Sequence, residues 1–151
     1  MAKKAATPST VTLKHLAAAL AQDHELSKKA AEAILTDMVT RITKHLKKGL
    51  NDLQSATMWL VQNAMAKPDN AGAASTDYMH LFGLVALGYM WARMVKAAQS
   101  KLAEGASAAL YESKIVTGRY FMERVMPETA AHLARISSGA DTMMALPAEA
   151  F

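Results

Sequence analysis

Cysteine is absent from the 151-residue sequence. Its absence excludes disulfide bonds, thiolate zinc sites, iron–sulfur clusters and a cysteine nucleophile. Glycine and proline are scarce, at seven and four residues, which excludes a collagen-like or low-complexity chain and disfavours a turn-rich all-β fold. The sequence also lacks a Gly-x-Ser-x-Gly elbow, a phosphate-binding loop and a dinucleotide fingerprint. The length suits one ordinary domain or two small helical units.

Long hydrophobic segments are absent too. The longest uninterrupted apolar run, residues 81–92, is too short to span a bilayer and predicts a buried helix surrounded by protein. Within it, Gly83 and Gly88 are expected to let neighbouring helices approach closely. The N-terminus has no apolar core of a signal peptide, so we expect a cytoplasmic protein without membrane contact.

Positive charge and aromatic residues are divided unevenly along the chain. Residues 1–49 hold nine Lys and Arg against four Asp and Glu, a net +5. Residues 50–151 hold eight against nine, a net −1, and contain all nine Phe, Trp and Tyr. A basic half weakly suggests a polyanionic partner, although a solvated lysine-rich helix surface is the simpler interpretation.

Apolar residues recur at spacings of three and four, which predicts amphipathic helices and an all-α helical bundle. Residues 1–9 are expected to form a flexible tail. Helices are predicted over residues 12–22, 27–66, 76–104 and 107–138, with a loop over residues 67–72.

Individual residues mark the expected helix ends and bends. Ser27 is the predicted N-cap of the second helix, which we expect to continue through Gly49 because the apolar stripe keeps its phase there. Gly105 and Gly139 are expected to end helices. Pro127 is expected to kink the last helix, because its ring clashes one turn back.

One stretch resembles a DNA-binding protein. Residues 10–49, TVTLKHLAAALAQDHELSKKAAEAILTDMVTRITKHLKKG, resemble the N-terminal helix pair of the bacterial histone-like protein HU, with its Leu-Ser-Lys-Lys-Ala connection and closing Leu-Lys-Lys-Gly. The β-sheet saddle and basic arms of that family do not follow Gly49. The resemblance implies a helical hairpin that packs a dimer core, with most of the family's DNA contacts missing.

The rest of the chain resembles a different family. Within residues 50–151, the stretches LNDLQSATMWLVQNAMAKPDNAGAASTDYMHLFGLVALGYMWARM and GRYFMERVMPETAAHLARISSGADTMMALPAEAF resemble the C-terminal helical domain of acyl-CoA dehydrogenases, in the branch similar to 3-methylmercaptopropionyl-CoA dehydrogenase. The resemblance implies an accessory domain that packs on the enzyme body. The flavin, the acyl-CoA and the catalytic glutamate belong to upstream domains of that family, so we expect no enzyme activity and no cofactor.

Together the two resemblances describe a fusion, in which an HU-like hairpin continues through one long helix into a dehydrogenase-like bundle. We expect a non-enzymatic assembly module. The alternatives are a weak, sequence-independent DNA-binding protein of the bacterial nucleoid and an accessory domain that docks onto an acyl-CoA dehydrogenase.

The first two predicted helices carry the residues for both binding hypotheses. A homodimer is expected, because a two-helix hairpin cannot bury both of its apolar stripes. The predicted dimer core is Leu13, Leu16, Leu20, Leu35, Met38, Ile42 and Leu46. The candidates for DNA contact are Lys3, Lys4, Lys28, Lys29, Lys44, Lys47 and Lys48.

Two pairs of side chains have the spacing of metal ligands on one helix. Asp77 and His80 are three residues apart, and Glu128 and His132 are four apart. A carboxylate-bridged di-metal bundle would need a Glu-x-x-His spacing on two helices, which is absent. We therefore expect no metal site and no catalytic residue.

Overall fold

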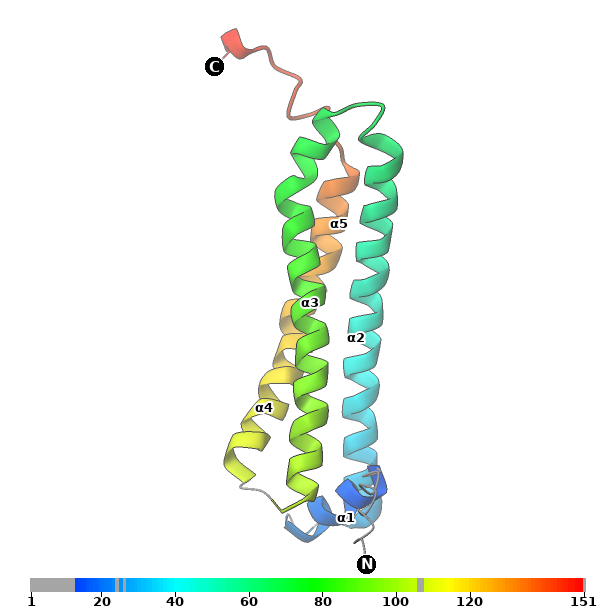
Figure 1. Cartoon of the computed structure of the whole chain (residues 1–151), viewed down its shortest axis with the longest axis vertical. Helices are drawn as coiled ribbons and strands as arrows, with labels where there is room; N and C mark the ends of the chain where they lie inside the picture. The colour runs from blue at the N-terminus through cyan, green and yellow to red at the C-terminus, as the bar shows by residue number, and fades with distance from the viewer. Residues whose placement is uncertain (1–12, 24, 26, 106–107, 151) are drawn as a thin grey trace, which may run out of the picture.

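The computed structural model describes residues 13–23, 25, 27–105 and 108–150, and every regular element in these ranges is a helix (Figure 1). The all-α prediction is therefore confirmed for the described part of the chain. In order, the elements are α1 (Leu13–Asp23), α2 (Lys28–Asn63), α3 (Asp69–Ala103), α4 (Ala108–Tyr120), η1 (Phe121–Val125), η2 (Met126–Glu128), α5 (Thr129–Ser137) and η3 (Ala148–Ala150).

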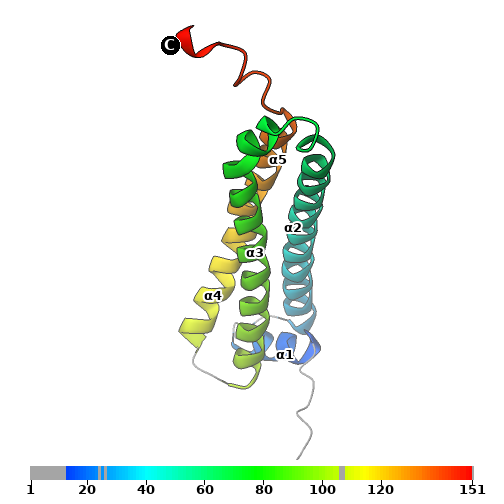
Figure 2. The same ribbon diagram turned by 45° about the horizontal axis from the view of Figure 1, so that its top comes forward.

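The long helices α2 and α3 run side by side and define the length of the molecule (Figure 1). At 1.5 Å per residue, each is about 50 Å long. Helices α4 and α5 follow one another along this pair, with α5 packed against both α2 and α3 and α4 packed against α3. Helix α1 lies across one end of the bundle (Figure 2), and the C-terminal segment extends from the other end.

Helix α2 is continuous through Gly49, as the unbroken apolar stripe predicted. Its first turn is capped by Ser27, whose Oγ accepts a hydrogen bond from the Ala30 backbone N–H at 3.2 Å. This cap satisfies one of the backbone donors that have no partner inside the helix. The predicted start of the helix is confirmed, and its end lies three residues earlier than expected, at Asn63.

Helix α3 begins at Asp69, so the loop predicted over residues 67–72 is mostly wrong. Pro68 has φ −56° and ψ −31° at the N-cap, a helical conformation that proline tolerates at a helix start because it has no N–H to satisfy. The Asp69 carboxylate in the first turn is favoured by the helix dipole. The Asn70 amide accepts from the Ala140 N–H at 3.0 Å and donates to the Asn63 carbonyl at 3.3 Å, which secures this end of the bundle.

The predicted helix over residues 107–138 is broken at its middle. Its hydrogen-bonding pattern changes to a π-helical turn over η1 and a 3₁₀ turn over η2, which contains Pro127. Proline removes one N–H and clashes with the preceding turn, so the wider π turn accommodates the displaced bonds. The kink is confirmed where it was predicted. Helices α3 and α5 end before Gly105 and Gly139, whose φ angles are +80° and +70°, as expected.

Two apolar clusters form the core. One contains Ala17 and Ala21 of α1 with residues of α2, α3, η1 and η2, namely Leu35, Met38, Ile42, Val95, Met122 and Met126. The other joins α2, α3 and α5 through Ala56, Ala74, Leu81, Val85 and Ile136.

The predicted dimer core is covered within a single chain where the structure describes it. Leu35, Met38 and Ile42 are 7–8% exposed, and Leu46 packs against the same cluster. The stripe is covered from the same chain, because α3 and the turns before α5 fold against α2. The side chains of Leu13, Leu16 and Leu20 lie outside the described part of the chain. Dimerisation itself stays a prediction.

The apolar run of residues 81–92 is not surrounded by protein, contrary to the prediction. Phe82, Leu87 and Tyr89 are 54–56% exposed, while Leu81 and Val85 are buried. By length and composition alone α3 is long and apolar enough to cross a membrane, and 28% of its most apolar stretch is buried in the bundle. This helix therefore carries an apolar surface as well as an apolar core face.

Candidate functional site

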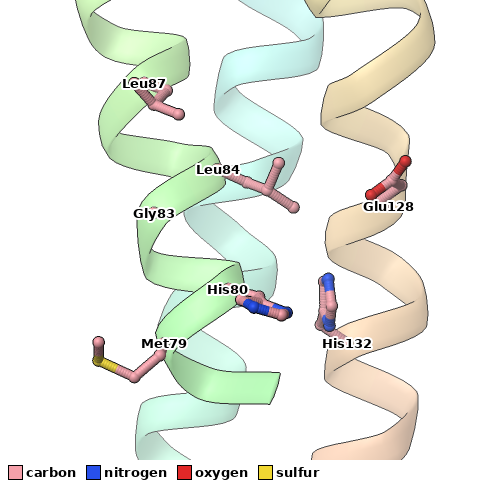
Figure 3. A pocket seen from close by; sticks show the side chains of 7 residues that line it. All are labelled: Met79, His80, Gly83, Leu84, Leu87, Glu128 and His132. Atoms are coloured by element: carbon pink, nitrogen blue, oxygen red, sulfur yellow. The ribbon is translucent and has the colours of Figure 1, made fainter. Parts of the chain in front are cut away.

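A pocket of about 270 Å³ lies between α3 and the start of α5 (Figure 3). Its wall on α3 is largely apolar, and its wall on the other side carries a carboxylate and an imidazole. The lining residues are Met79, His80, Gly83, Leu84, Leu87, Glu128 and His132.

Gly83 contributes no side chain there, and a Cβ at this position would meet nothing within 4 Å. The predicted close approach of a helix at Gly83 is therefore wrong, whereas at Gly88 it is confirmed by Met126 Sδ, 2.8 Å from an ideal Cβ position.

His132 is held in place by a carboxylate of α3. Its Nδ1 lies 2.7 Å from Asp77 Oδ1, and its side chain is 10% exposed. Arg135 also donates to Asp77 Oδ1, at 3.1 Å. The hydrogen bond to His132, with a further contribution from Arg135, lowers the pKa of Asp77 below its usual value although partial burial opposes the shift. Asp77 therefore remains ionised at neutral pH and orients the imidazole.

His80 faces His132 across the pocket. The two ring centroids are 5.4 Å apart in an edge-to-face arrangement. Figure 3 shows both rings directed into the space between α3 and α5, with Glu128 one turn from His132 on the same side. Among the described residues, no hydrogen bond or ion pair joins Glu128 to either histidine. These three polar side chains, His80, His132 and Glu128, thus border one space, and in the described part of the chain no hydrogen bond joins them to one another.

The two ligand-spaced pairs predicted from the sequence come together around this pocket, but in a different pairing. Asp77 bonds His132 on the other helix rather than acting with His80. Within the described ranges, no group of three or more His, Asp or Glu side chains is arranged to hold a metal ion. The sequence could not predict the Asp77–His132 bond, because it depends on how α3 packs against α5.

A second feature is an exposed apolar strip on α3, which we call the α3 face and define as Phe82, Ala86, Tyr89 and Met90. These residues follow one another at helical spacing and point to the same side. Phe82, Tyr89 and Met90 are about half exposed, at 56%, 55% and 48%. The sequence has no Asp, Glu, Lys or Arg between Asp77 and Arg93. The Arg93 guanidinium lies over the Tyr89 ring, with its Cζ 5.8 Å from the ring centroid. The α3 face is therefore an apolar strip with one cation at its end, on a helix that is anchored from its other side.

The predicted DNA-contact lysines do not form one patch. All five that the structure describes, Lys28, Lys29, Lys44, Lys47 and Lys48, are exposed on α2. They fall into two groups, and the nearest members, Lys29 and Lys44, are fifteen residues apart, or about 22 Å along the helix axis. Lys48 is paired with Asp52 at 2.8 Å, which offsets part of its charge. Lys3 and Lys4 lie outside the described residues.

Comparisons with known proteins agree with one of the two resemblances. Residues 1–147 match the protein family described as acetyl-CoA dehydrogenase C-terminal like. A relative, 3-methylmercaptopropionyl-CoA dehydrogenase of Ruegeria pomeroyi, is 29% identical over 124 residues, which is 82% of this chain. The same alignment covers 20% of the relative, so the chain spans about a fifth of that protein's length.

The HU resemblance has no support from these comparisons. The family match begins at residue 1 and runs through Gly49 without a break, so it includes the whole segment assigned to HU. The structure agrees with the continuous match, because α1 packs against α3 as well as α2. The prediction that the chain is a fusion of two proteins is therefore not supported.

Proposed function

Because the chain belongs to the acetyl-CoA dehydrogenase C-terminal-like family, we propose that it is a non-enzymatic helical domain that docks through the α3 face onto the body of an acyl-CoA dehydrogenase. The observation that carries the proposal is the α3 face itself. A half-exposed apolar strip on a well-anchored helix, bordered by a cation, is typical of a protein interaction surface.

The relative supports the choice of partner. Four fifths of the dehydrogenase from Ruegeria pomeroyi lies outside the region that this chain matches. A domain of this family therefore exists, in that protein, beside a much larger body. A surface that packs against such a body would be left exposed in the domain alone, as the α3 face is here.

The composition of the α3 face suits this role. Aromatic residues and methionine are enriched in interfaces, and charged residues are depleted at their centres. Phe82, Tyr89 and Met90 each have about half of their side chain still to bury. At 1.5–3 kcal/mol for a fully buried large side chain, each would contribute roughly 1 kcal/mol on docking.

The pocket gives no support for catalysis by covalent attack. An oriented histidine next to a carboxylate can activate a hydroxyl or thiol nucleophile. The residues lining the pocket include no serine, threonine or cysteine that could serve as that nucleophile. This composition favours a docking role over a hydrolytic one.

A photocross-linking experiment tests the proposal. A photoreactive phenylalanine analogue replaces Phe82 in cells that produce the protein, and cross-linked peptides are identified by mass spectrometry. We expect peptides from the body of an acyl-CoA dehydrogenase. The matched control places the analogue at Val116, which is 67% exposed on α4 and lies outside the α3 face, and should give none.

Two outcomes would overturn the docking proposal. One is a cross-link from position 82 to a second copy of this chain, accompanied by a mass of twice 16.2 kDa in light scattering that Phe82→Lys reduces to 16.2 kDa. The other is equal labelling of dehydrogenase peptides from positions 82 and 116, which would indicate nonspecific contact.

A further inference from the structure

We propose that the pocket between α3 and α5 binds a small organic cation, a primary ammonium group attached to a short aliphatic chain. The site consists of the Glu128 carboxylate, the free edge of the His132 ring and the apolar wall of α3. This inference is separate from the docking role, because it concerns a cavity that the isolated chain already contains.

His132 supplies a fixed hydrogen-bond acceptor. An ionised carboxylate can only accept hydrogen bonds, so the contact with Asp77 places the hydrogen on His132 Nδ1. In the neutral ring, Nε2 then carries a lone pair. No hydrogen bond from another described residue to Nε2 is found, and His132 lines the pocket. The acceptor is therefore free to receive an N–H from a ligand.

Glu128 supplies the charge that selects a cation. It lies one turn before His132 and lines the same pocket. No ion pair involving Glu128 occurs within the described residues, and Arg135, the nearby cation of α5, is bonded to Asp77. The pocket lining contains no Lys or Arg. An ammonium group would therefore find one carboxylate and one imidazole nitrogen, whereas a ligand carboxylate would be repelled.

The opposite wall defines the rest of the ligand. Met79, Leu84 and Leu87 provide apolar surface, and Gly83 leaves open space between them. A volume of about 270 Å³ lies just below the usual range for ligand pockets, so only a small ligand would fit. A bare metal ion is a poorer fit, because no three ligand side chains of the described chain are arranged around one point. The cavity suits an ammonium group with a tail of a few carbon atoms.

Nuclear magnetic resonance of the histidine rings in the whole chain tests this site. The probes are n-butylammonium, methylammonium and butyrate, titrated at pH 8. We expect a saturable shift of the His80 and His132 ring signals with n-butylammonium, in the millimolar range. Methylammonium should bind severalfold more weakly because it lacks the tail, and butyrate at least tenfold more weakly because of its charge.

Two variants and a control locate the binding. Glu128→Gln should weaken n-butylammonium at least fivefold, and Gly83→Leu should abolish the shift by filling the cavity. Glu149→Gln, which removes an exposed carboxylate far along the chain from the pocket, should change nothing. Circular dichroism checks that each variant keeps its helix content.

The site would be refuted by equal or tighter binding of butyrate, by binding that survives Gly83→Leu in a folded variant, or by no saturable shift at 100 mM n-butylammonium. None of these results bears on docking, because the titration uses the chain without a partner protein. A failure of the cross-linking experiment would likewise leave this titration unaffected.

Discussion

Met126 occupies the space that a side chain at Gly49 would fill. The terminal methyl of Met126 contacts the position of a Cβ at Gly49, and Val85 Cγ2 lies 3.4 Å from the same point. Met126 also lies against Gly88 of α3 and is only 1% exposed. The two glycines therefore let one methionine pack between α2 and α3, and Gly49 is in the helix for packing rather than to end it.

This packing predicts the effect of Gly49→Ala. Alanine gains about 1 kcal/mol of helix propensity, but overpacking a confined methionine costs about 1–3 kcal/mol. We expect a net loss of about 1 kcal/mol in the free energy of unfolding, measured by urea denaturation. In a Met126→Ala background the same change should stabilise the protein. Gly72→Ala is the control, since a Cβ there meets nothing within 4 Å, and it should be neutral or stabilising.

A second prediction concerns the bond between α5 and α2. Thr129 Oγ1 donates to Asp52 Oδ2 at 2.7 Å, and Thr129 is 1% exposed. Thr129→Val keeps the shape and removes the donor, so it should destabilise the fold by about 1.5–3 kcal/mol, the range for a hydrogen bond to a charged group. Thr129→Ser should recover most of the loss in denaturant titrations. Equal losses in both variants would show that packing, and not the bond, is responsible.

The Asp77–His132 pair predicts a dependence on acid. The pKa of Asp77 is lower in the folded state than in the unfolded state. Ionised Asp77 therefore adds to the free energy of unfolding above the unfolded-state pKa of about 3.9. This contribution is lost as the pH falls through the folded-state pKa. At pH 7, Asp77→Asn should cost about 1–3 kcal/mol. The difference in the free energy of unfolding between the unchanged protein and Asp77→Asn should become smaller below pH 4. A difference that is constant from pH 7 to pH 2 would contradict the assignment.

Binding to duplex DNA should be weak and steeply dependent on salt. The N-terminal 49 residues carry +5, but the described lysines form two separate groups rather than one patch. Few phosphate contacts imply a Kd of roughly micromolar or weaker at physiological salt. Fluorescence anisotropy over a salt series measures this. Nanomolar binding at 150 mM salt would restore the nucleoid hypothesis.

The parts of the fold that follow from local chemistry were predictable. The Ser27 cap, the continuous α2 and the kink near Pro127 depend on residues within one or two turns. The start of α3 was misplaced because residues 67–72, which include Pro68, were predicted as a loop, although proline is well suited to the start of a helix. The exposure of Phe82 and its neighbours was also missed, since periodicity alone does not show which surface of an apolar helix is covered.

The HU assignment failed for a related physical reason. Residues 10–49 are rich in alanine, leucine and lysine at helical spacing, a composition that suits any amphipathic hairpin on the surface of a bundle. Leu35, Met38 and Ile42 would be buried in either family, so the stripe did not identify the partner surface. The pairing of Asp77 with His132 could not be predicted from the sequence either, because it joins residues that are 55 positions apart.

Helices α4 and α5, on either side of the kink, are buried to very different extents. Among residues 109–120 of α4, only Gly118 is buried, whereas the shorter α5 buries Thr129, His132 and Ile136 and is tied to α2 and α3 by polar bonds. We therefore expect α4 to have a lower local stability than α5 and to open before the rest of the protein unfolds. Its release would uncover Val95 and Trp91, which lie against Gly118. We expect the native state to include a rare form in which the bundle persists without α4, so the amide hydrogens of α4 should exchange with solvent ahead of those in α5.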